Sequence, residues 1–420
     1  MEQSEGRMIE MAVTYLLSVA LALFSGALPA QILGIIWEPV CADIAVDIPY
    51  ISLLRLLCAA GAVLAVVISD RIHGYILVRD LIVGAIALEA MSLIGFSMSR
   101  EFWNLGIWIT AIGFAGGLCL SLLCYLLRET YSGKTNLVFI SSALGIAVGV
   151  YCVRYVLSLG RSWRTACQAL AILQIILCMT VFLLRRAIMH DVAALLKKRR
   201  KEAGILRQRS REKLIKEKGT VDERSQNAYL VKLLFIYGSA ICCGLLLLSA
   251  CHLTFTALVS QGDMSADLGV SIITVCTGIA AGRAAVCVMN MTAGEGRHIG
   301  RNLAVGEAVT LAGLIISAVI VYTGNSAGPA VVVIRILTGC GGGMIFPNLI
   351  QMEDERFDDE AQTAMAGLIP AFYLGAGAVI TPFVQSMSGA SGMKVCIPAM
   401  AALAVCMGVC LAFASVKIRR

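Results

Sequence analysis

Residues 11–37 read MAVTYLLSVALALFSGALPAQILGIIW, an apolar stretch without a charged side chain. About 20 helical residues cross the hydrocarbon core of a bilayer, and a helix satisfies its backbone hydrogen-bonding groups within its own segment. The stretch is too long for the apolar core of a signal peptide. We therefore predict that it is the first of twelve membrane-spanning helices. The others are residues 50–69, 75–98, 103–127, 137–159, 166–184, 233–259, 268–291, 303–322, 327–350, 364–384 and 395–416.

The composition of the whole chain excludes a water-soluble globular enzyme. Of the 420 residues, 59% are hydrophobic and only 15% are charged, and the mean hydropathy is +0.84. Most of the 16 cysteines lie in apolar stretches and are interpreted as small packing residues, whereas Cys41 is expected in a short polar loop. No cysteines and histidines occur at metal-ligand spacing. We expect no disulfide, no metal and no cofactor.

Basic residues give the orientation of the chain in the membrane. Lys and Arg gather in the segments that share a side with the N-terminus, which predicts cytoplasmic termini and a multi-pass protein of the cell membrane. Residues 185–228 hold fourteen basic and six acidic side chains. A segment tethered between two membrane halves is expected to lie against anionic lipid, not nucleic acid. The short external loops favour a prokaryotic source.

Two short motifs recur in the second half of the chain. Arg79-Asp-Leu-Ile-Val-Gly84 at the start of the third stretch matches Arg301-Asn-Leu-Ala-Val-Gly306 at the start of the ninth. Gly113-Phe-Ala-Gly-Gly117 in the fourth stretch matches Gly339-Cys-Gly-Gly-Gly343 in the tenth. The matches predict a duplicated six-helix unit. The expected organisation is an amino-terminal bundle over residues 1–184, a basic cytoplasmic linker over 185–228 and a carboxy-terminal bundle over 229–420.

Two segments carry a family resemblance. The first is the loop after the second stretch, Val66-Val-Ile-Ser-Asp70-Arg71-Ile-His73-Gly74-Tyr75. The second lies in the tenth stretch, where Arg335-Ile-Leu-Thr directly precedes the glycine motif that starts at Gly339. Together with the six-plus-six organisation, they resemble the major facilitator superfamily of secondary transporters. The resemblance implies an all-α membrane protein with twelve transmembrane helices in two pseudo-symmetric bundles. It also implies that Asp70, with Arg71, takes part in gating at the cytoplasmic side. Val66 stands where the family motif has a glycine.

Ionisable residues inside the membrane are costly, so each needs a partner or a wet cavity. Arg55 and Glu89 are expected at one depth on neighbouring spans, and Arg283 and Glu307 repeat this arrangement in the second half. Each pair is interpreted as a structural clamp or as part of a proton or substrate relay. Arg154 is expected near the outer end of its span, where its side chain either reaches the headgroups or lines a site.

Arg335 is the strongest candidate for substrate binding. The tenth span faces the central cavity in the family that the chain resembles, and a guanidinium can hold a carboxylate or phosphate by two hydrogen bonds. The alternative is that Arg335 binds carbonyl groups of a neighbouring helix. Other candidate contacts are Gln31, Trp108, Tyr373 and His252, of which the last can titrate near neutral pH.

The sequence therefore predicts a secondary active transporter that moves a small solute by alternating access. The arginines favour an organic anion or a hydroxylated metabolite, and coupling to protons or another ion is expected at the intramembrane ionisable residues. The alternatives are a transporter-like membrane sensor and a polytopic membrane enzyme, although no cluster of catalytic groups supports the enzyme. We expect a monomer that has no catalytic residues and does not bind nucleic acid.

Overall fold

The computed structural model describes most of both halves of the chain. The described residues are 2–47, 50–72, 77–130, 135–184, 231, 234–246, 268–293, 299–323, 328–356, 369, 373 and 390–415. Every regular element among them is a helix, as predicted. The predicted linker at 185–228, His252 and nearly all of the predicted span 364–384 lie outside the described residues.

The first membrane span is a helix with a break, and it is longer than predicted. Helix α1 (Glu2–Ala27) ends before Pro29, and α2 (Ile32–Ile44) continues the same apolar span. The intervening residues form tight turns, in which the amides of Leu28 and Ala30 bond to carbonyls three residues earlier. Proline has no amide hydrogen, which accounts for a break at this position. Because α2 extends to Ile44, Cys41 lies within a helix, and its expected place in a polar loop was wrong.

The other helices follow the predicted spans closely. The amino-terminal half contains α3 (Ile51–Ile72), α4 (Val78–Met98), α5 (Phe102–Thr130), α6 (Thr135–Ser158) and an apolar helix at Trp163–Leu184. The carboxy-terminal half contains α9 (Leu268–Ala293), α10 (Ile299–Thr323), α11 (Gly328–Arg356) and α14 (Ala390–Ser415). The predicted span 233–259 is described as a helix over Leu234–Leu246, and its remainder lies outside the described residues. Among the described residues, 8 helices are long and apolar enough to cross a membrane.

Glycines bring α5 against α3 in the amino-terminal half. A Cβ added at Gly113 would lie 1.9 Å from the carbonyl oxygen of Cys58, and one at Gly117 would lie 2.5 Å from that of Ala62. In return, a Cβ at Gly61 of α3 would lie 2.2 Å from the carbonyl oxygen of Thr110. These backbones meet closely because the three positions have no side chain, as is common between helices in membranes.

The carboxy-terminal half repeats this contact between α9 and α11. Gly339 and Gly343 face the carbonyl oxygens of Val275 and Ile279, and Gly278 faces that of Ile336, at 2.3–2.5 Å from an added Cβ. The contacting residues of α3 and α9 are 217 positions apart in every case, and those of α5 and α11 are 226 apart. The internal duplication predicted from the sequence is therefore present in the helix packing.

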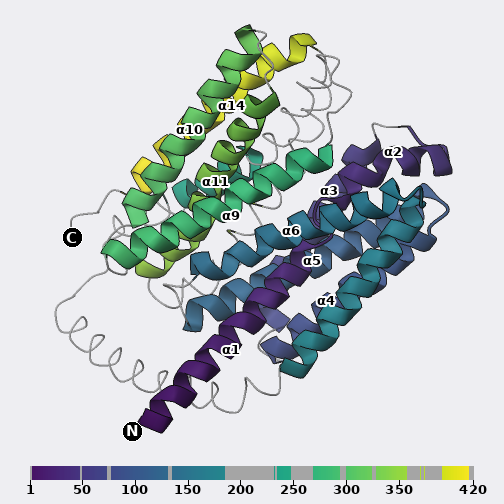
Figure 1. Cartoon of the computed structure of the whole chain (residues 1–420), viewed down its shortest axis with the longest axis horizontal. Coiled ribbons are helices and arrows are strands. Elements are labelled where there is room, and N and C mark those ends of the chain that lie inside the picture. Colours follow the sequence, from purple (N-terminus) through teal and green to yellow (C-terminus); the bar gives the residue numbers. More distant parts are fainter. Residues whose placement is uncertain are drawn as a thin grey trace.

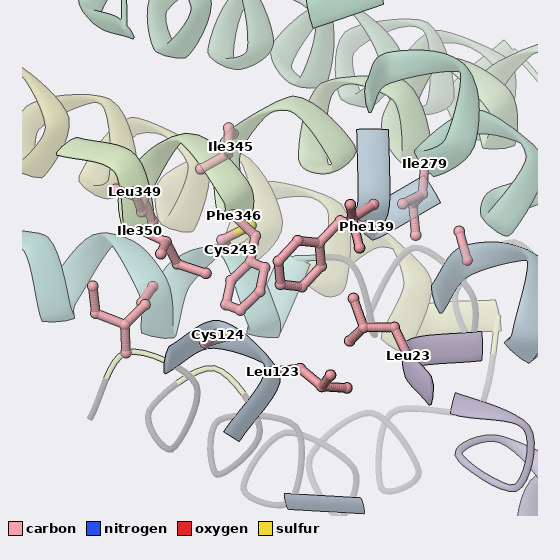
Figure 2. Close-up of a cluster of buried hydrophobic side chains, with 14 of the residues drawn as sticks. Leu23, Leu123, Cys124, Phe139, Cys243, Ile279, Ile345, Phe346, Leu349 and Ile350 are labelled. Carbon is pink, nitrogen blue, oxygen red and sulfur yellow. The ribbon is translucent and has the colours of Figure 1, made fainter. Parts of the chain in front are cut away.

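The two halves meet along α6 and α9. Figure 1 shows the amino-terminal helices, purple to teal, on one side of the molecule and α9–α14, green to yellow, on the other. One buried apolar cluster joins them, with Leu23 and Leu123 from the first half and Ile279, Ile345 and Leu349 from the second (Figure 2). At the start of α9, the side chain of Arg154 packs against Gly269, so this arginine reaches the other half instead of extending away from it.

A polar cluster ties three helix ends together in the amino-terminal half. Arg164 donates from Nε and Nη2 to Asp43 Oδ2 at 3.1 and 2.9 Å. Its Nη1 donates to the carbonyl oxygens of Ser97 and Ser99 at 2.8 and 2.6 Å. The indole of Trp163 also donates to Asp43 at 3.1 Å, and the guanidinium lies 4.4 Å from the centre of this ring. One side chain thus connects the ends of α2 and α4 to the start of the Trp163–Leu184 helix.

Replacing Arg164 with Gln should lower the free energy of unfolding by about 2 kcal/mol, because two backbone carbonyls and one carboxylate lose a cationic donor. The matched change Arg161→Gln, at an exposed position nearby, should alter it by less than about 0.5 kcal/mol. Thermal unfolding of the detergent-solubilised protein measures both. Equal shifts in the two variants would show that the cluster contributes nothing to stability.

Candidate functional site

A cavity of about 320 Å³ lies between the two halves. In the first half it is lined by residues of α1 to α6, including the break between α1 and α2. In the second half it is lined by residues of α9, together with Gly244, Phe346 and Tyr373. Its volume is at the lower end of the range for small-molecule sites, and most of its wall is apolar. A small number of polar side chains faces it: Gln31, Arg55, Glu89, Ser142, Arg283 and Tyr373.

Arg283 connects the second half to the first at this cavity. Its side chain is 5% exposed, and Nη1 donates to the carbonyl oxygen of Phe139 and, at 2.9 Å, to the hydroxyl of Ser142. The guanidinium lies 5.5 Å from the centre of the Phe139 ring. Its Nε–H is buried and has no hydrogen-bond partner among the described residues. Since buried polar groups normally have partners, this donor is a candidate for contact with a bound solute.

The side chain of Glu89 reaches the cavity from α4, although α5 lies between α4 and the cavity. The carboxyl group, 1% exposed, passes beside Gly116 of α5, where an added Cβ would be 3.6 Å from Oε1. Gln174 Nε2 donates to Oε2 at 2.5 Å and also to the carbonyl oxygen of Ser25 at 3.2 Å, just before the break in the first span. Gln174 therefore fixes the carboxyl group relative to α1.

Replacing Gln174 with Leu should destabilise the protein by about 2 kcal/mol, because a buried carboxyl group and a buried carbonyl lose their shared donor. In a Glu89→Leu background the same replacement should cost about 1 kcal/mol less, since no carboxyl group is then left without its donor. A double-mutant cycle of unfolding free energies measures the difference. Additive effects would mean that the contact between Gln174 and Glu89 has no energetic weight.

Aromatic rings form one wall of the cavity. The rings of Phe139 and Phe346 meet edge to face with centroids 5.7 Å apart, and Figure 2 shows them side by side between the two halves. Phe346 also packs against Tyr373, at 4.3 Å between centroids. Edge-to-face and tilted pairs are favourable ring geometries. The wall gives the cavity an apolar surface beside the guanidinium of Arg283.

Neither of the two predicted ion pairs is found among the described residues. Glu89 bonds to Gln174 and makes no ion pair with Arg55 among the described residues, although both line the cavity. Arg283 bonds to α6, and neither carboxyl oxygen of Glu307 has a hydrogen-bond partner among the described residues. The reason is the same in both halves. The two spans of each predicted pair are separated in space, because α5 packs between α3 and α4 and α11 packs between α9 and α10.

The other predicted site residues are divided between the cavity and positions away from it. Gln31 and Tyr373 line the cavity. Arg335 is 3% exposed on α11 and is not among its lining residues, because it lies three turns, about 16 Å, from Phe346 along the helix. Trp108 also does not line it, because its indole fills the space left by Gly95 of α4.

For the predicted gating residues the structure describes only the backbone, and it does not describe His252. Asp70 and Arg71 lie in the last turn of α3, and their side chains lie outside the described residues, as does His252. Sequence reasoning missed Gln174 and Gly116 as parts of the site. A glutamine in the middle of an otherwise apolar span was the available signal for Gln174.

Comparisons with known proteins agree with this architecture. The sequence profile of the Major Facilitator Superfamily matches residues 11–382. No curated protein sequence matches the chain. The solved structure of the proton:xylose symporter XylE, bound to 6-bromo-6-deoxy-D-glucose, matches with a TM-score of 0.64 at 12% sequence identity. The match covers 95% of this chain and 94% of that chain, and at this identity it shows the fold. The chain is thus a multi-pass membrane protein that belongs to the major facilitator superfamily.

Proposed function

We propose that the protein is a secondary active transporter that moves a small organic anion or hydroxylated metabolite by alternating access. The observation that carries the proposal is the mostly apolar cavity with a few polar side chains between two duplicated halves, which is where a transporter of this architecture binds its solute. Arg283 replaces Arg335, the first candidate from the sequence, as the proposed anchor, because Arg283 lines the cavity and its Nε–H has no hydrogen-bond partner in the described part of the chain.

The charges of the cavity favour a solute with a negative group. The described lining residues include two arginines, Arg55 and Arg283, and one acidic residue, Glu89, so positive charge is in excess at the cavity. A cationic solute would meet this charge unfavourably, whereas a carboxylate would form charge-assisted hydrogen bonds with a guanidinium. Glu89 is the candidate site for a coupling proton. XylE, with its similar fold, is a proton symporter.

We also propose the roles of the segments around the cavity. Residues 1–184 and 229–420 would be the two moving halves, and the basic linker at 185–228 would lie on anionic lipid at the cytoplasmic side. Asp70 and Arg71 would close the inner side of the transporter. The resemblance of residues 66–75 to the family motif supports this role.

Counterflow in liposomes tests transport and separates it from sensing. Liposomes that contain the purified protein and an unlabelled organic acid or sugar should transiently accumulate the same labelled solute from outside. The expected result is accumulation for at least one anionic or hydroxylated solute of a panel that also contains amino acids and cations. A solute that shifts the thermal unfolding of the protein but shows no counterflow would favour a membrane sensor instead.

A further inference from the structure

The cavity presents one pole that is suited to an anion. Arg283 uses Nη1 for the Phe139 carbonyl and the Ser142 hydroxyl, and its buried Nε–H has no partner among the described residues. A guanidinium has five N–H donors in one plane, so donors remain for a carboxylate while the contact with α6 persists. This pole comes from α9, in the carboxy-terminal half.

A second pole is suited to hydroxyl groups and comes from the amino-terminal half. Gln174 holds Glu89 Oε2, and the carboxyl group faces the cavity through the gap at Gly116. A carboxyl group can accept hydrogen bonds from solute hydroxyls. The half-buried amide of Gln31, at the break in the first span, lines the same cavity and can donate or accept hydrogen bonds. This pole would repel a second anionic group of the solute.

We propose that the solute is a single molecule that carries both groups: a monoanionic hydroxy acid, with its carboxylate at Arg283 and its hydroxyls at Glu89. The inference rests on the proposed function and narrows its substrate class. A hydroxy acid bound in this way joins a residue of each half, whereas a simple carboxylic acid or a polyol engages one pole only. A dianion is disfavoured because its second anionic group would lie at the carboxyl group of Glu89, which offers no cationic donor.

Equilibrium binding to matched probes tests the proposal on the full-length protein. The hydroxy acids glycerate, threonate and gluconate are compared with propionate, butyrate and hexanoate, which lack the hydroxyls, and with glycerol, erythritol and sorbitol, which lack the carboxylate. Thermal unfolding at increasing probe concentration gives each affinity. At least one hydroxy acid should bind about tenfold or more tightly than both of its partners, since each lost hydrogen bond to a charged group costs that factor or more.

Two variants assign the poles. Glu89→Gln should remove the preference for the hydroxy acid over the simple acid, and Arg283→Gln should remove its preference over the polyol. The matched surface changes Glu101→Gln and Arg161→Gln should leave every affinity unchanged. If a variant does not fold, the test is the preference of the unmodified protein for the hydroxy acid over the simple acid and the polyol.

Several results would overturn the inference. These are equal binding of the hydroxy acid and its hydroxyl-free partner, absence of binding by every hydroxy acid of the panel, and selectivity that persists in both pole variants. Counterflow of a solute from another class would overturn this inference while the transport function stood. Binding of a hydroxy acid without counterflow would support the site and contradict transport.

Discussion

Adding one methyl group at Gly113 should disrupt the amino-terminal bundle, and adding one at Gly282 should disrupt the carboxy-terminal bundle. A Cβ at Gly113 would lie 1.9 Å from the carbonyl oxygen of Cys58, and a Cβ at Gly282 would lie 2.0 Å from that of Cys340. These neighbours are backbone atoms of packed helices, so they cannot turn away as a side chain could. The helices must separate, and we expect each alanine variant to lose about 3 kcal/mol or more of stability.

Gly84 is the matched control for these alanine variants. It lies within α4, and an added Cβ would meet nothing within 4 Å. Gly84→Ala should leave stability unchanged or raise it by up to about 1 kcal/mol, because alanine is the better helix former. Thermal unfolding and size-exclusion profiles of the solubilised protein measure all three variants. If Gly84→Ala and Gly113→Ala behave alike, the close packing of α3 and α5 is not what stabilises the bundle.

Replacing Arg283 with Gln should reduce the transport rate of an anionic solute by about a hundredfold or more. The change removes the positive charge at the cavity and an Nε–H donor that bonds to none of the described residues, and each hydrogen bond to a charged group contributes about 1.5–3 kcal/mol. Arg283→Lys should retain part of the rate, because it keeps the charge but not the planar arrangement of donors. Initial counterflow rates measure both.

Arg161→Gln is the control for the Arg283 variants, because Arg161 is exposed and distant in sequence from the cavity-lining residues. It should transport at the unmodified rate. Ser142→Ala provides a second comparison, since it removes one acceptor of the Arg283 contact and leaves the cationic group in place. An Arg283→Gln variant with a normal rate would place the anchor of the solute elsewhere.

The sequence predicted the helical fold and the duplicated architecture because both follow from properties that are visible residue by residue. The length of hydrocarbon fixes the length of an apolar span, so the boundaries of α3 to α6 and α9 to α11 fall near the expected positions. The repeated glycines of the fourth and tenth stretches also have a direct structural meaning. At Gly113 and Gly339 they permit the same contact in each half.

The rotation and neighbours of each span could not be predicted in the same way. In a membrane protein, lipid-facing and buried positions are both apolar, so the pattern of side chains does not show which face is inside. Glu89 was therefore paired with Arg55, although α5 separates their helices and Gln174 supplies the actual contact. For the same reason Arg335 was expected at the cavity, where the structure instead places Arg283.

The break in the first span also could not be predicted from composition. Residues 11–37 contain no charge to mark an end, and Pro29 interrupts the helix without ending the span. The break shapes the candidate site because it places Gln31 at the cavity and the Ser25 carbonyl within reach of Gln174. A proline followed by a polar residue inside an apolar stretch was the local indication of it.

The side from which Cys58 can be modified tests alternating access most directly. This native thiol lines the cavity, whereas Cys167 is fully buried away from it and serves as the internal control. A membrane-impermeant thiol reagent is applied to either side of proteoliposomes in which the protein has one orientation, and modification at each residue is quantified by mass spectrometry. Our account predicts that Cys58 reacts from both sides, that a bound solute slows the reaction, and that Cys167 stays unmodified. Reaction of Cys58 from one side only, with and without solute, would contradict it.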